Sequence, residues 1–396
     1  MPYAEALDRV LTRVGRLGVT QVRIGDSVGL VTSGKVTAPG DVPPFDNSAV
    51  DGFAVRSADV TAPVTELRVL GTIAAGTAPE HRLSAGECVR IMTGAVCPPD
   101  ADSVVMVEHT TMVDGSTVRV EGAAEPGRHV RRRGDDLRAG DVAVRAGTVL
   151  RPAHVGLLAT VGRSHVEVFR RPLVGVLSTG DELVGPDEHL APGQIRDSNR
   201  QMLLAACEAA GFETVDLGLI ADDEELIEAA LRAGVQRCDA ILTSGGVSMG
   251  DFDYVKAVLS RIGDMDWMQV AIKPAKPFAF GAIAEIPVFG LPGNPVSSLV
   301  SFELLAKPGL RAMAGYPDPN PPSVVATAAD GIKRRSDGKT HYVRVALRPG
   351  AGGLTAHVTG AQGSHQLAAS ADADGLAVLA DGEGVAAGEV VEVIPI

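Results

Sequence analysis

The chain has 396 residues, which is too long for one ordinary core, so we expect two to four domains. Hydrophobic residues make up 45% and charged residues 21%, a balance typical of a soluble globular protein. The net charge of −13 argues against nucleic acid as a partner, because a polyanion needs a field of the opposite sign. An anionic ligand would therefore need cations concentrated locally.

Neither a membrane nor a secretory route is indicated. The best apolar run is interrupted by Pro292 and Pro295 and falls short of the ~18 residues of a membrane span. The first residues include Glu5 and Asp8 and lack the basic start of a signal peptide. We expect a cytoplasmic protein whose cysteines form no zinc-type spacing and stay reduced: Cys88, Cys97, Cys207 and Cys238.

The first third of the chain changes from one helix to short strands. Apolar residues from Leu7 to Leu17 follow helical spacing and predict an amphipathic helix. From about Ser27 to Leu150 short alternating runs predict a β-rich region, with strands at Glu66–Ile73, Cys88–Met92, Ser103–Glu108, Thr117–Glu121 and Asp141–Val149. Pro152 is suited to the first position of a helix over Ala153–Val161.

In the middle third, strands alternate with helices. The predicted strands are Leu173–Ser178, Thr214–Ile220, Ala240–Thr243 and Pro287–Leu291, and the predicted helices are Ser198–Ala210, Asp223–Ala233, Phe252–Ile262 and Val296–Leu310. This alternation predicts βαβ units and a parallel sheet covered on both faces. Ligands of such sheets lie at the carboxyl ends of the strands, so this region is the catalytic candidate.

A proline-rich segment, 316–322, predicts a stiff linker before a tail of further short strands. The tail is expected to form a small barrel or sandwich.

The loop after Ala240–Thr243 has the composition of an anion-binding turn. Gly245 and Gly246 would allow backbone N–H groups to approach a ligand, and Ser244 and Ser248 would add hydroxyl donors. A tight strand–helix turn without a ligand is the alternative.

Acidic and basic residues are placed around the same predicted sheet. Glu182, Asp222 and Asp253 would share one rim, where Mg²⁺ could bridge them to phosphate oxygens. Helix capping is an alternative for Asp222, with Glu225 completing a capping box. Prolines stiffen the Lys273–Pro277 segment, whose two lysines would be local cations or, alternatively, solvated surface charges.

Several motifs resemble one known family in the same order along the chain. They comprise residues 43–55 (PPFDNSAVDGFAV), 91–95 (IMTGA), 134–136 (GDD), 178–183 (STGDEL), 244–253, 273–280 and 290–298. The chain is thereby similar to the MoeA type of molybdopterin molybdenumtransferase, which has its eukaryotic counterpart in a domain of gephyrin. Val50 and Phe53 stand where this family more often has Met and Tyr.

The resemblance implies an elongated, four-domain subunit and a homodimer with active sites between subunits. It implies a transferase of molybdenum cofactor biosynthesis that acts on adenylylated molybdopterin and molybdate and releases AMP. The residues implied as catalytic are Asp51, Thr93, Asp136, Glu182, Asp222 and Asp253, of which the last three would hold Mg²⁺. Those implied for substrate binding are Ser244, Gly245, Gly246, Ser248, Pro292 and Pro295, and those for molybdate are Lys273, Lys276, Ser297, Arg344 and Ser364.

The expected fold class is multidomain α/β plus β. A central parallel-sheet α/β domain of molybdopterin-binding type would be joined to a β-rich second domain and a small C-terminal β-barrel. The expected boundaries are 1–42 for the N-terminal helix and linker-domain segment, 43–140 for the β-rich domain, 141–170 for the return segment of the linker domain, 171–315 for the α/β domain and 320–396 for the barrel. Asp51 and Asp136 lie outside the α/β domain, so we expect them to reach into the partner's cleft.

Other functions stay open at this point. A molybdopterin adenylyltransferase shares the α/β domain but is a single compact domain, and a gephyrin-like scaffold would not need the acids and lysines. Contacts with the adenylyltransferase and with recipient molybdoenzymes are possible. Molybdate and tungstate are too alike for the sequence to separate. Cys97, near Thr93, is a candidate soft ligand for molybdenum, with a buried thiol as the alternative.

Overall fold

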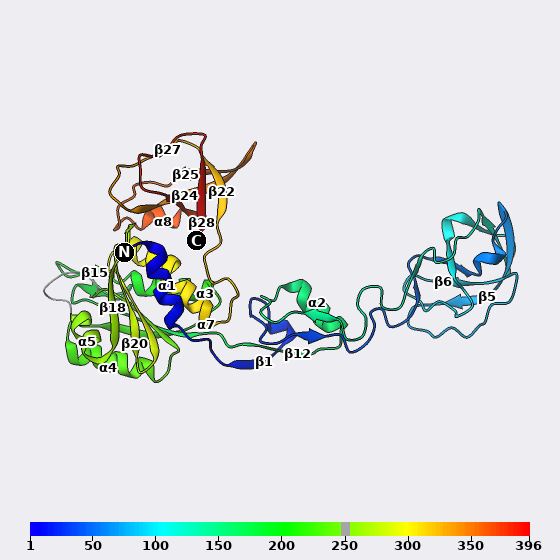
Figure 1. The fold of residues 1–396 in the computed structure, drawn as a ribbon, viewed down its shortest axis with the longest axis horizontal. Coiled ribbons are helices and arrows are strands. Elements are labelled where there is room, and N and C mark those ends of the chain that lie inside the picture. The colour runs from blue at the N-terminus through cyan, green and yellow to red at the C-terminus, as the bar shows by residue number, and fades with distance from the viewer. Residues whose placement is uncertain (247–253) are drawn as a thin grey trace.

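The computed structural model describes residues 1–246 and 254–396. Figure 1 shows an elongated chain with an α/β body and a barrel at one end, a β body at the other, and a linker between them.

The α/β body is built on a six-stranded sheet in the order β16-β13-β17-β21-β20-β18. The bounds are β16 Glu213–Ile220, β13 Leu173–Thr179, β17 Ala240–Ser244, β21 Ile286–Leu291, β20 Pro277–Ile283 and β18 Asp264–Gln269. The first four strands are parallel, as predicted, whereas β20 and β18 are antiparallel to their neighbours. The four predicted strands are all parallel, and the sequence prediction did not include β20 and β18, which extend this edge by a hairpin of β20 and β21.

Helices cover both faces of this sheet, as predicted. They are α3 Asn199–Ala209, α4 Glu224–Val235, α5 Tyr254–Ile262, α6 Pro295–Ser301, the π-helical turn Phe302–Ala306 and α7 Lys307–Met313. Neighbouring residues of one strand enter different cores: Val176 packs with Leu203 of α3, and Leu177 packs with Ile227 of α4. Strand β13 is thus apolar towards both faces of the sheet, which explains its unbroken run of buried residues.

The N-terminal helix α1 (Tyr3–Arg13) packs on the α/β body, where Ala6, Leu7 and Val10 join the core that contains Phe289 and Leu310. The chain then leaves in β1 (Val19–Arg23) and returns in β12 (His165–Phe169), which pair antiparallel. A second outgoing and returning pair consists of β2 (Val36–Thr37) and β11 (Val142–Val144), beside α2 (Pro152–Thr160). Two chain passes therefore connect the distal β body to the rest (Figure 1).

The distal body contains a six-stranded sheet in the order β7-β4-β6-β5-β9-β8. The bounds are β4 Gly52–Val55, β5 Val64–Ile73, β6 Glu87–Ile91, β7 Ser103–Met106, β8 Thr110–Met112 and β9 Thr117–Glu121, with β3 Asn47–Ser48 paired to β10 Val130–Arg131.

The C-terminal strands close into a five-stranded barrel, which decides between the predicted barrel and sandwich. The circuit β24-β25-β22-β28-β26 returns to β24. The bounds are β22 Val324–Ala328, β24 Thr340–Gly350, β25 Gly353–Val358, β26 Gly375–Leu379 and β28 Val390–Pro395. The barrel is attached to the α/β body through β19 (Ile272–Lys273), which pairs parallel with the start of β24. The short strands β14 Leu183–Val184, β15 Ile195–Arg196, β23 Ile332–Lys333 and β27 Gly384–Val385 and the helix α8 Ala368–Ala371 complete the fold.

Candidate active site

A cavity of about 630 Å³ lies at the carboxyl ends of the parallel strands. Seven residues predicted from the sequence line it: Glu182, Asp222, Ser244, Gly245, Gly246, Pro292 and Pro295. They lie at or just beyond the carboxyl ends of β13, β16, β17 and β21, which share one edge of the sheet because those strands are parallel. Ser248 and Asp253 of the predicted site lie outside the described residues.

Glu182 lines the cavity just beyond the end of β13. Its carboxylate folds back over Gly180, where an added Cβ would lie 2.7 Å from Glu182 Oε2. Gly180 has a φ of 149°, a conformation that L side chains rarely adopt. A glycine at this position therefore leaves room for the carboxylate at the cavity.

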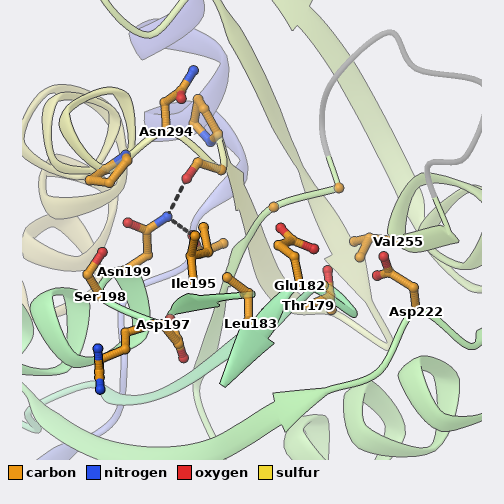
Figure 2. A pocket seen from close by; sticks show the side chains of 18 of the residues that line it. Thr179, Glu182, Leu183, Ile195, Asp197, Ser198, Asn199, Asp222, Val255 and Asn294 are labelled. Atoms are coloured by element: carbon orange, nitrogen blue, oxygen red, sulfur yellow. Dashed lines mark hydrogen bonds between the residues drawn. The ribbon is translucent and has the colours of Figure 1, made fainter. Parts of the chain in front are cut away.

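Asp222 follows β16, and its backbone N–H donates to Asp181 Oδ1 at 3.0 Å. The residue that caps helix α4 is Asp223, whose side chain accepts from the N–H of Leu226 at 2.9 Å. The alternative of Asp222 as the N-cap was thus wrong by one residue. The carboxylate of Asp222 instead lines the same cavity as that of Glu182, and Figure 2 shows both side chains.

The glycine turn differs in one respect from the predicted anion cradle. The N–H of Gly245 donates to the carbonyl of Leu291 at 3.1 Å, so this donor holds the turn to β21 and is not available to a ligand. Gly246 is required for space, because a Cβ there would overlap the side chain of Val255 in α5. Ser244 retains a hydroxyl at the cavity.

A second cavity of about 760 Å³ lies between the α/β body and the barrel and shares Pro277 with the first. It is lined by Lys273, Lys276, Ser297 and Ser364, four of the five residues predicted to bind molybdate. Lys333 and Lys339 of the barrel also line this cavity. This is the local positive charge that an acidic chain needs to hold an oxyanion.

Arg344 is the exception among the predicted molybdate ligands. Its side chain is buried, and five acceptors from Ala361 to Ser370 take up its donors. Burial lowers the pKa of its guanidinium. Arg344 therefore holds the loop that carries Ser364, and among the described residues only Ser364 of this pair lines the cavity.

Asp51, Thr93 and Asp136 line neither cavity of their own chain. Asp51 directly precedes β4 and Thr93 follows β6 in the sheet of the distal body, which Figure 1 shows at the other end of the chain from the α/β body. The N–H and hydroxyl of Thr93 both donate to Asp51 Oδ1 at 2.7 Å and lower the pKa of that carboxyl. Asp136 is exposed and lies in the segment between β10 and β11. Cys97 is buried, and burial raises the pKa of its thiol to about 11, which favours the inert buried thiol.

Comparison with known proteins covers nearly the whole chain. Residues 1–162 match the MoeA N-terminal region (domain I and II), residues 175–312 a probable molybdopterin binding domain, and residues 326–396 the MoeA C-terminal region (domain IV). The chain is 37% identical over 379 residues to a molybdopterin molybdenumtransferase of Haemophilus influenzae, with 94% of this chain and 93% of that protein covered. The chain belongs to the MoeA family of molybdopterin molybdenumtransferases.

Further relatives agree with this MoeA membership. Molybdopterin molybdenumtransferase 2 of Mycobacterium tuberculosis is 40% identical over 369 residues, which cover 90% of this chain and 89% of that protein. A solved molybdopterin biosynthesis MoeA protein of Pyrococcus horikoshii covers both chains completely, with a TM-score of 0.86 at 28% identity. The predicted family, fold class, enzyme class of transferase and role in molybdenum cofactor biosynthesis are confirmed.

Some residues that line the first cavity were not predicted from the sequence. Asp197 and Asn199 at the start of α3, Tyr254 of α5 and His365 of the barrel all line it. The start of α3 lies on the same rim as the predicted loops, so its Asp-Ser-Asn run was a usable signal. His365 could not be placed without knowing how the barrel docks. No helix among the described residues is long and apolar enough to span a bilayer.

Replacing Arg344 tests its assignment as the residue that holds the Ser364 loop. Arg344→Leu leaves several buried acceptors without donors, so we expect the barrel to lose more than about 3 kcal/mol of unfolding free energy. Denaturant unfolding measures this loss, and Arg348→Leu, on the exposed part of the same strand β24, is the matched control. Equal stability of both variants would contradict the assignment.

Proposed function

We propose that this transferase inserts molybdenum from molybdate into adenylylated molybdopterin and releases AMP. The observation that carries the proposal is a pair of cavities that share Pro277 in their linings, one lined by carboxylates and a glycine turn and the other by lysines and serines. The first suits a nucleotide-linked phosphate with a divalent cation, and the second suits a tetrahedral oxyanion.

The donor set at the first cavity fits Mg²⁺ in kind. Mg²⁺ is commonly bound by one or two carboxylates together with substrate phosphates, and Glu182 and Asp222 provide two. No cluster of three or more His, Cys, Asp or Glu residues suited to a metal occurs within 1–246 and 254–396, and the proposed third ligand, Asp253, lies outside them. When bound, Mg²⁺ would neutralise charge on the phosphoanhydride.

The protein's own groups would act by placement and charge. Ser244 would donate to the anionic part of the substrate, and Lys273 and Lys276 would hold molybdate beside the dithiolate. Water would add to the phosphoanhydride, with AMP leaving and the pterin keeping its phosphate. No protein nucleophile enters this scheme, so the catalytic effect rests on orientation and electrostatic stabilisation.

The functional unit is proposed to be a homodimer. Asp51, Thr93 and Asp136 resemble the family's functional residues but line neither cavity of their own chain, and β4 and β6, which Asp51 and Thr93 adjoin, belong to the distal body. A two-fold dimer could bring the distal body of one subunit to the α/β body of its partner.

Molybdate-dependent AMP release tests the proposed function. Purified protein given adenylylated molybdopterin and Mg²⁺ should release AMP when molybdate is added and much less without it. The same assay with tungstate, with sulfate as the inert oxyanion control, would define oxyanion preference. Tight binding of the pterin without AMP release under any condition would point to a scaffold or carrier and overturn the proposal.

A further inference from the structure

One side chain joins three elements at the floor of the first cavity. Asn199 begins α3, and its amide nitrogen donates to Ser244 Oγ at 2.8 Å and to the carbonyl of Gly293 at 2.6 Å. Ser244 is the last residue of β17, and Gly293 lies in the turn between β21 and α6. Figure 2 shows these two bonds and places Asn199 and Asp222 at opposite sides of the pocket, with Glu182 between them in this view.

The orientation of the Asn199 amide is determined by its partners. A rotation of the amide by half a turn would place Asn199 Oδ1 against the Gly293 carbonyl, where two acceptors would face each other. The start of the helix is held as well, because Asp197 accepts from the backbone and side chain of Arg200 and from the hydroxyl of Ser178. The amide therefore presents its donors to Ser244 and Gly293.

This orientation leaves an uncompensated acceptor. Asn199 is 8% exposed, and within the described part of the chain its Oδ1 is buried without a hydrogen-bond partner. A buried acceptor of this kind costs about 1–3 kcal/mol. This cost is offset in part by the two hydrogen bonds that the Asn199 amide donates to Ser244 and Gly293.

The contact also determines what Ser244 can do. Its Oγ accepts from Asn199 and has no further partner among the described residues, although Ser244 is only 2% exposed and lines the cavity. A hydroxyl has one proton to donate, and no described residue accepts the proton of Ser244. With Asn199 on one side, the O–H can turn towards an anionic ligand.

We propose that Asn199 is a positioning residue that orients the Ser244 hydroxyl as a donor to the anionic substrate and fixes the turn carrying Pro292 and Pro295. The inference rests on the proposed function, because it assumes a phosphate-bearing substrate in this cavity. Donors fixed before the substrate binds stabilise developing charge without reorganisation. Asn199 acts through its two neighbours and touches no reacting atom.

A double-mutant cycle on AMP release tests the proposal. Asn199→Ala and Ser244→Ala should each lower kcat at least about tenfold. The kcat of the double variant should lie within about threefold of the kcat of the less active single variant. Independent contributions would instead multiply. Multiplying effects, or a parental kcat for either single variant, would overturn the proposal.

Two further variants separate positioning from folding. Ser244→Thr keeps the hydroxyl and should keep most of the activity that Ser244→Ala loses, and this pair decides the role of the hydroxyl even if Asn199→Ala fails to fold. Asn320→Ala, in the exposed linker, should behave like the parental protein. A parental protein that releases no AMP with molybdate would defeat the proposed function itself, whereas an active parent with insensitive Asn199 and Ser244 variants would defeat only this inference.

Discussion

A one-to-one mixture of Asp51→Ala and Glu182→Gln subunits should recover about a quarter of the parental rate of AMP release, although each variant alone is nearly inactive. Each variant should lose about 100-fold or more in kcat, since each removes a charged group proposed to act on the substrate. The recovery follows from sites shared between two subunits, with the distal body of one chain completing the cavity of the other.

The expected fraction comes from counting sites. Random exchange makes about half of the dimers mixed, and a mixed dimer has one site with both residues intact and one that lacks both. The measurement is AMP release after subunit exchange, with two affinity tags used to show that mixed dimers have formed.

A matched pair within the distal body provides the control. Asp51→Ala mixed with Asp136→Ala should recover nothing, because each site of the mixed dimer would still lack one of the two residues. Absence of recovery in the Asp51–Glu182 mixture, with mixed dimers present, would contradict the shared site. Recovery in both mixtures would contradict the assignment of Asp51 and Asp136 to the same site.

The parallel part of the central sheet could be predicted because its strands are short apolar runs that end in polar loops. Leu173–Ser178 was predicted and Leu173–Thr179 is observed, and the carboxyl ends of these strands place Glu182, Asp222 and Ser244 around one cavity. Parallel pairing puts every such loop on the same edge, so the site could be located without knowing the order of the strands.

The antiparallel edge of the sheet was missed for a local reason. Strands β20 and β21 are joined by a two-residue turn at Ala284 and Glu285, with φ values of 47° and 72°. Positive φ at both central residues is typical of the type I′ turn, which usually has Asn-Gly or a similar pair. Ala-Glu carries no such signal, so the pairing contacts of the two strands outweigh the turn preference.

The sequence predicted which residues line the site better than it predicted which of their hydrogen-bond donors remain free for a ligand. Gly245 lines the cavity, but its N–H is taken by Leu291, and Arg344 is occupied by the loop from Ala361 to Ser370. Both facts depend on contacts between segments far apart in the sequence. A motif specifies which groups are present, whereas the tertiary structure decides which donors remain for a ligand.

Lys276→Ala should raise the KM for molybdate by about 10- to 100-fold while the kcat for AMP release at saturating molybdate stays near the parental value. Lys273 and Lys276 line the second cavity, and neither has an ion-pair partner within the described residues, so an oxyanion would gain their charge without displacing a carboxylate.

The pattern of change in KM and kcat distinguishes binding from catalysis for this lysine. A contact made equally in the bound and transition states changes KM alone, whereas a larger fall in kcat would give Lys276 a role in the chemical step.

Lys276→Arg keeps the charge, so its KM for molybdate should rise less than that of Lys276→Ala. The difference from the parental protein should also shrink as salt is added, because Lys276 is exposed and its field is screened. Lys35→Ala, an exposed lysine of the linker outside both cavities, is the charge-matched control. An unchanged KM for molybdate in Lys276→Ala and in the Lys273→Ala/Lys276→Ala double variant would remove the second cavity as the oxyanion site.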